Sequence, residues 1–161
     1  MSTFEREDFR WRETYFILFD SPVRPTLQRV VKVLENLSNN FEIVNQRAED
    51  EGRFDSLTCM SPDDYAALDI SYLQGEEVIE QSALLIEEMK RSAADPEERA
   101  KITRIAACDA RFDVMHFQQV SGGEEDDLDE RFDPSALLIV VEALTHLTDG
   151  VAVDPQSGAF L

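Results

Sequence analysis

The residues of this chain best suited to acid–base chemistry are its two histidines and the carboxylates near them. His116 lies in the apolar run 112–117, and Asp113 would lie on the opposite face of a strand there, because side chains alternate along a strand. A general base needs a carboxylate or a substrate within hydrogen-bond reach. His146 would lie near the last carbonyl groups of a helix, where imidazole is favourable without a catalytic role. We therefore expect a structural histidine at position 116 and predict no catalytic residue.

A second distinctive stretch is Asp154-Pro-Gln-Ser-Gly158. Proline presets φ at one position of a turn, and glycine accepts a positive φ three residues later. The Asp154 carboxylate could cap this turn, and Gln156 would be displayed at its tip. The pattern predicts a hairpin that joins the last two strands. Asp154 and Gln156, together with Asp113 and His116, are the candidate binding residues of the chain.

Motifs for metals, nucleotides and activated nucleophiles are absent from the sequence. It has no HExxH, no CxxC and no histidine pair at helical spacing, so we predict no zinc site. The acidic run 124–130 lacks the spaced ligands and central glycine of an EF-hand, and would bind divalent ions only weakly and non-specifically. Phosphate-binding glycine loops and the Gly-x-Ser-x-Gly elbow are also missing. We therefore predict no cofactor and no dedicated metal site.

The two cysteines, Cys59 and Cys108, each lie in or beside an apolar pattern. Two cysteines do not make a disulfide scaffold, so we expect reduced, buried thiols. Arg104 precedes Cys108 by one helical turn, but no histidine pattern marks either cysteine as an activated thiolate.

The charge balance limits the classes of partner. The chain has 161 residues and a net charge of −19, which argues against a basic face for nucleic acid or anionic membrane. The first residues lack the pattern of a secretory signal, and the longest apolar runs are too short to cross a bilayer. These features predict a cytoplasmic protein that would attract a basic partner.

The spacing of apolar residues predicts most of the elements. The runs 14–19, 41–46, 53–60, 68–72 and 112–117 are typical of strands, and the charged segment 49–52 is short enough to join the second and third as a hairpin. Helices are expected over 27–37, 76–91 and 96–107, the last with Asp95 as its cap. We expect one domain over 1–161, with a frayed segment 1–10 and an acidic, flexible loop 121–131.

The last element is a helix over 134–147 that is apolar almost all round, with Asp133 as N-cap and Pro134 at its first position. Such a helix belongs where more than one side is covered. Either neighbouring helices and the acidic loop cover its outer side, or a second subunit does.

The end of the chain, Leu147 to Leu161, resembles the closing segment of small uncharacterised bacterial proteins. In those proteins a helix leads into Gly-Gly, a strand and an Asp-Pro-Gln-x-Gly turn, where this chain has Asp149-Gly150 in place of the double glycine. The resemblance implies a terminal strand and a bacterial, cytoplasmic origin. It brings no activity, cofactor or site residue with it.

The order of elements predicts an α+β fold, a two-layer sandwich of a mostly antiparallel sheet with helices packed on it, as a ferredoxin-like variant. For function we expect a non-enzymatic module for protein–protein interaction or self-association, with a homodimer as one form. One alternative is a hydrolase or transferase that joins His116 to a carboxylate such as Asp113 or Asp154, with Mg²⁺ as a candidate ion. Another is an acidic DNA mimic or toxin-neutralising protein, which rests on net charge alone.

Overall fold

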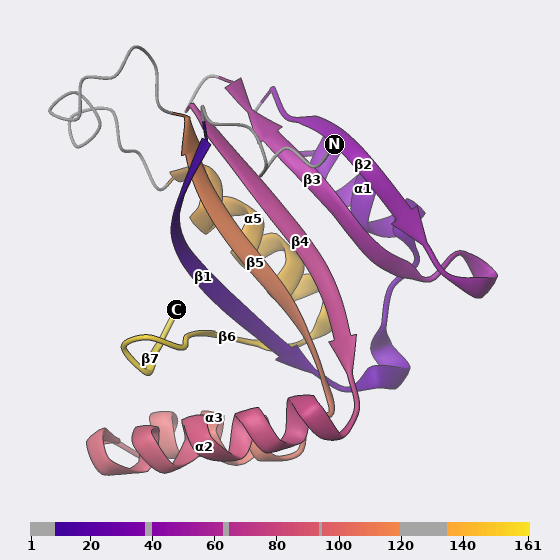
Figure 1. The fold of residues 1–161 in the computed structure, drawn as a ribbon. Helices are drawn as coiled ribbons and strands as arrows, with labels where there is room; N and C mark the ends of the chain where they lie inside the picture. Colours follow the sequence, from indigo (N-terminus) through magenta and orange to yellow (C-terminus); the bar gives the residue numbers. More distant parts are fainter. Residues whose placement is uncertain (1–8, 38–39, 63–64, 94, 120–134) are drawn as a thin grey trace, which may run out of the picture.

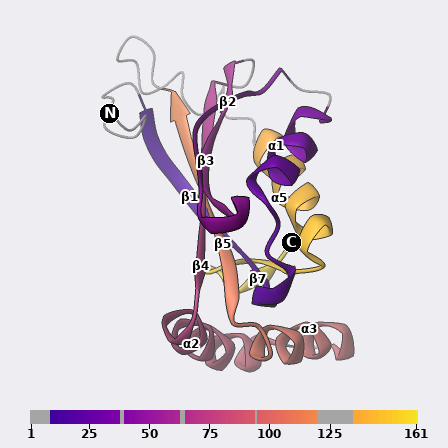
Figure 2. The same cartoon turned by 90° about the vertical axis from the view of Figure 1, so that its right-hand side faces the viewer.

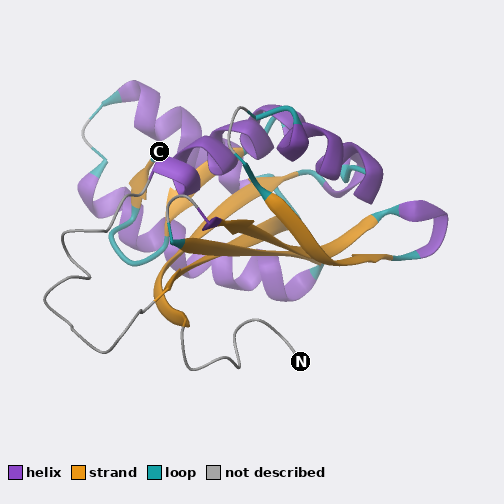
Figure 3. Ribbon diagram, turned by 90° about the horizontal axis from the view of Figure 1, so that it is seen from above, coloured by secondary structure: helices purple, strands orange, loops and turns teal. Residues whose placement is uncertain are grey.

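The fold is built on one seven-stranded antiparallel sheet with the strand order β2-β3-β4-β5-β1-β6-β7. It is seen in a computed structural model that describes residues 9–37, 40–62, 65–93, 95–119 and 135–161. The strands fan out in a twisted sheet, as right-handed strand twist requires (Figure 3). The helices cover one face and one end of the sheet (Figure 1 and Figure 2).

The first strand, β1 (Phe9–Phe19), lies inside the sheet. It pairs along its whole length with β5 (Ala110–Gln119), from Phe9 opposite Gln119 to Phe19 opposite Ala110. The expectation that residues 9 and 10 are frayed was therefore wrong, because β5 extends far enough to pair with them. On its other side β1 pairs with β6 (Val151–Asp154) only over Phe16–Leu18.

Three consecutive strands form the other half of the sheet: β2 (Glu42–Ala48), β3 (Phe54–Ser61) and β4 (Ala66–Gln74). The predicted hairpin between β2 and β3 is confirmed, and Gly52 in its short 3-10 segment has the expected positive φ, 73°. β2 is the exposed edge strand, and its ladder is irregular beyond Val44.

Two helices, α1 (Leu27–Glu35) and α5 (Ser135–Thr148), pack on one face of the sheet (Figure 2). The Thr26 hydroxyl caps α1 by accepting a hydrogen bond from the Arg29 N–H. Leu137, Val140, Val141 and Leu144 of α5 are buried in the core on this face of the sheet, whereas Leu138 is exposed. Much of this apolar helix is thus covered from within the chain.

A second helical pair, α2 (Glu76–Ser92) and α3 (Pro96–Ala106), lies across one end of the sheet (Figure 1). It forms a smaller core with sheet residues such as Leu18 and Val153, which point away from α1 and α5. The predicted cap is confirmed, since the Asp95 carboxylate accepts a hydrogen bond from the Glu98 N–H at 2.8 Å.

Two residues, Asp149 and Gly150, connect α5 to β6, and each is constrained for a different reason. Asp149 has a φ of 51°, the left-handed conformation that commonly ends a helix. The next position, 150, has room only for a glycine, because an added Cβ there would lie 2.6 Å from the Leu18 carbonyl oxygen. β6 then turns into the two-residue strand β7 (Ala159–Phe160). The predicted terminal hairpin is confirmed, including a positive φ of 74° at Gly158.

The α+β class and the antiparallel sheet are confirmed, but the ferredoxin-like arrangement is not, because seven strands in this order do not form a simple βαββαβ unit. Asp133, Pro134 and the acidic loop 121–131 lie outside the described residues. Within the described ranges no helix has both the length and the apolar character needed to span a membrane.

Candidate functional site

The C-terminal hairpin β6–β7 contributes to three separate cavities. One lies between the hairpin and β1, one between the hairpin and the α2–α3 pair, and one between the chain end and α5. Concave surfaces of this kind are where ligands and partner side chains bind. We therefore take the hairpin and its surroundings as the candidate functional site.

The cavity between β1 and the hairpin, called the β1 notch below, has a volume of about 440 Å³. The residues that line it are Trp11, Arg12, Glu13, Tyr15, Asp154 and Gln156. Two of the four candidate residues singled out in the sequence, Asp154 and Gln156, thus line the same cavity.

Strand geometry explains why these groups meet. Glu13 and Tyr15 point to the same face of β1, two residues apart, and Asp154 continues β6 one residue beyond Val153, which pairs with Phe16. Burial raises the pKa of the Tyr15 hydroxyl, and the negative charges of Glu13 and Asp154 raise it further. Both carboxylates therefore act on the same phenol group.

The turn residues behave as the sequence predicted. The Asp154 carboxylate accepts hydrogen bonds from the Gln156 N–H and the Ser157 hydroxyl, both at 2.9 Å. This capping fixes the carboxylate beside the notch. Gln156 is exposed at the turn, where its side chain can contact a ligand.

His116 lies just behind the notch and lines none of the cavities found among the described residues. Its side chain is 1% exposed, and its Nδ1 lies 3.4 Å from a Glu13 carboxylate oxygen. Burial lowers the pKa of His116, although the neighbouring Glu13 acts in the opposite direction. The neutral imidazole is therefore favoured at pH 7, where it can hold Glu13 in position.

Asp113 lies on the opposite face of the sheet from His116, as the two-residue repeat predicted. Its carboxylate accepts a hydrogen bond from Arg111 Nε at 2.6 Å, and the Arg111 guanidinium lies over the Phe16 ring at 4.0 Å. Burial raises the pKa of Asp113, and the bond to Arg111 lowers it. The structure therefore separates Asp113 from the other three candidates.

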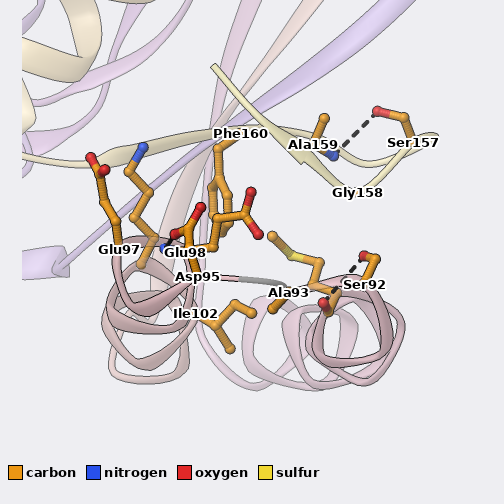
Figure 4. A pocket seen from close by; sticks show the side chains of 12 residues that line it. Ser92, Ala93, Asp95, Glu97, Glu98, Ile102, Ser157, Gly158, Ala159 and Phe160 are labelled. Carbon is orange, nitrogen blue, oxygen red and sulfur yellow. Dashed lines mark hydrogen bonds between the residues drawn. The ribbon is translucent and has the colours of Figure 1, made fainter.

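The cavity between the hairpin and the α2–α3 pair has a volume of about 430 Å³ (Figure 4). Asp95, Glu97 and Glu98 at the start of α3 line one side of it. Phe160 projects from β7 toward α3, and the Lys101 ammonium lies 5.2 Å from the centre of its ring. Lys101 thus already supplies a cation to this acidic cavity.

The third cavity is an apolar groove of about 410 Å³ along α5. Leu138, Val141, Ala152 and Leu161 form its apolar lining, and the polar groups of Glu142, Thr145 and His146 complete it. Leu161 is 50% exposed. The groove can accept an apolar side chain of a partner.

The cysteines have the character expected from the sequence. Both are buried and free. Burial raises the pKa of Cys59 to about 12 and that of Cys108 to about 11, although Arg104 lies 3.4 Å from the Cys108 sulfur and acts to lower it. Desolvation outweighs the arginine, so neither thiol is an activated nucleophile at pH 7.

Four residues that line the notch were not among the candidates from the sequence: Trp11, Arg12, Glu13 and Tyr15. A signal was present, since Phe9 and Trp11 alternate with charged residues in the period-two pattern of a strand. In the described part of the chain, no group of three or more His, Cys, Asp or Glu residues could hold a metal ion.

Comparison with protein-family models, with curated proteins and with solved structures gives no match to this chain.

Proposed function

We propose that this protein is a non-enzymatic interaction module that binds a basic segment of another protein at its C-terminal hairpin. The observation that carries the proposal is the hairpin itself, which lines three cavities on different sides within a chain of net charge −19. Charge of this size steers a basic partner toward the surface, and the cavities offer places to anchor its side chains.

The test compares peptides of matched apolar content that carry either basic or acidic residues, measured by calorimetry with the full chain at 50 and 500 mM NaCl. Basic peptides are expected to bind, with a Kd that rises at least about tenfold at the higher salt concentration because screening weakens the attraction. Equal affinity for the two peptide classes, or a Kd that salt does not change, contradicts the proposal.

A pair of leucine variants tests where on the protein the basic peptide binds. Leu161→Ala removes an apolar group from the groove beside the hairpin, whereas Leu84→Ala removes the same group from α2, where Leu84 is 72% exposed and lines none of the cavities described. The first variant is expected to weaken binding of the basic peptide and the second to leave it unchanged. Equal effects would move the binding surface away from the hairpin.

Self-association is the second candidate, because Leu138 and Leu161 leave apolar surface exposed along α5. The negative charge of two copies opposes it at low salt. A homodimer predicts a doubled mass in light scattering that increases with protein concentration and salt. A monomeric mass over a wide concentration range excludes it.

The hydrolase or transferase alternative receives less support. It requires His116 in a cavity beside Asp113 or Asp154, whereas the carboxylate at 3.4 Å from His116 is Glu13 and the histidine is buried. The DNA-mimic alternative still rests on net charge alone.

A further inference from the structure

We propose that the β1 notch is a recognition site for one lysine or arginine side chain of an extended basic segment. This inference rests on the proposed function, which it makes specific by assigning a residue type and a position. The notch combines negative charge, exposed aromatic surface and a neighbouring strand edge, and each of these selects for part of such a ligand.

The charges of the notch select for a cation. Glu13 and Asp154 come from strands at opposite ends of the chain, and both act on the hydroxyl group of Tyr15. Among the described residues that line the notch, Arg12 is the one basic residue, so the two carboxylates leave an excess of negative charge there. Glu13 is 22% exposed, which leaves it partly desolvated and able to interact more strongly than a surface carboxylate.

The Tyr15 ring selects for a cation carried on an alkyl stem. Tyr15 points to the same face of β1 as Glu13 and lines the cavity. The face of a tyrosine ring attracts ammonium and guanidinium groups, and the ring also covers the methylene groups of Lys and Arg. A small inorganic cation would not use this apolar surface. Trp11 is 43% exposed and lies toward the opposite face of β1, where its indole N–H donates a hydrogen bond to the Thr14 hydroxyl at 3.0 Å.

The position of the notch selects for a side chain on an extended backbone. The pairing of β1 with β6 ends at Phe16, because β6 turns away after Asp154 into the hairpin. The edge of β1 at Glu13–Tyr15 therefore lies directly beside the cavity. A strand that adds to a sheet edge contributes main-chain hydrogen bonds, and its alternate side chains fill pockets along that edge.

The experiment uses Trp11, the single tryptophan of the chain, as a fluorescent reporter at the edge of the notch. The probes are the N-acetyl methylamides of lysine, arginine, norleucine and glutamate, titrated into the full chain at 50 mM NaCl. Lysine and arginine amides are expected to give a saturable change in emission, and norleucine and glutamate amides are not. An equal response to norleucine would assign the site to apolar groups and overturn the proposal.

Two variants remove the charges of the notch with little change in shape. Glu13→Gln and Asp154→Asn are each expected to raise the Kd of the lysine amide about fivefold, which corresponds to about 1 kcal/mol for a partly exposed charge pair. Asparagine at 154 retains one oxygen, which can accept the hydrogen bond from the Gln156 N–H, while its amide N–H can donate to the Ser157 hydroxyl. Unchanged melting curves verify that each variant is folded. Glu80→Gln, on the exposed face of α2, removes one charge elsewhere and is expected to leave the Kd unchanged.

The outcomes separate this inference from the proposed function. If basic peptides bind with the expected salt dependence but neither notch variant weakens them, the notch assignment is wrong and the wider function stands. If the lysine amide binds in the notch but no basic peptide binds more tightly than it, the notch stands and the protein partner does not. Tighter binding of spermidine than of a basic peptide would indicate that the ligand of the notch is a free polyamine and not a protein segment.

Discussion

Gly150 offers the sharpest test of the packing around the C-terminal hairpin. Its φ does not lie in the left-handed region, so backbone conformation alone predicts that Gly150→Ala is neutral or slightly stabilising. Packing predicts the opposite. An added Cβ would lie 2.6 Å from the Leu18 carbonyl oxygen, 2.9 Å from the Thr148 hydroxyl and 3.2 Å from an Ile17 methyl group.

The expected cost follows from which atoms must move. Overpacking a well-packed site costs about 1–3 kcal/mol, and the upper part of this range applies here because the closest atom belongs to the backbone of the inner strand β1. The restricted unfolded chain of the alanine variant offsets about 0.4–1 kcal/mol. We therefore expect a net loss of about 2 kcal/mol, which lowers the Tm of a chain of this size by roughly 4–8 °C.

The matched control is Gly52→Ala. Gly52 has a φ of 73°, and an added Cβ would meet nothing within 4 Å. This variant therefore carries only the conformational cost, about 1 kcal/mol. The assay is thermal unfolding followed by circular dichroism on both variants at one pH. If Gly150→Ala melts at the same temperature as the parent or above Gly52→Ala, the argument from close contact with β1 fails.

Three further variants test other parts of the structure by thermal unfolding. Asp149→Gly relieves a non-glycine residue at a φ of 51° and should stabilise the protein by about 0.5–1 kcal/mol; a lower Tm would contradict this. Asp95→Ala removes the cap of α3 and should cost about 1 kcal/mol, whereas an unchanged Tm would show that the cap is dispensable. Burial raises the pKa of Asp69 from 3.8 to about 6, so the folded state holds its proton more tightly and stability falls as pH rises through this interval. Asp69→Asn should therefore raise the Tm at pH 8 more than at pH 4, and equal shifts would refute the assignment.

The sequence was sufficient to predict the elements whose signals are local. Five apolar runs became strands, and the helices began and ended close to the predicted residues, because amphipathic spacing and capping act within a few residues. The capping by Asp95 and the turn at Asp154 are of this kind. Each depends on side chains that contact their own neighbours in the chain.

The candidate site could be predicted only in part, because it depends on pairing between distant segments. Asp154 reaches Glu13 and Tyr15 only because β6 pairs with β1, and no local pattern specifies that neighbour. The full length of β1 could not be predicted either, because its first residues are charged and favour a solvated tail. Pairing with β5 stabilises them as part of the strand. The opposite faces of Asp113 and His116 were predictable, because they follow from alternation along a single strand, whereas the contact of His116 with Glu13 depends on the pairing of β5 with β1.

The place of β1 in the sheet also affects how the chain can fold. Its partners are β5 and β6, so β1 is made before the other described strands but has no sheet neighbour until residues 110–119, and later 151–153, have been made. The pairings of β2 with β3 and of β3 with β4 are local and can form while β1 waits, although β4 also pairs later with β5. Such long-range closure slows folding and exposes apolar edges for longer. Among the described strands, β1, which supplies four of the six residues that line the proposed notch, therefore waits longest for its sheet neighbours, and its apolar residues are ones that a chaperone could protect during synthesis.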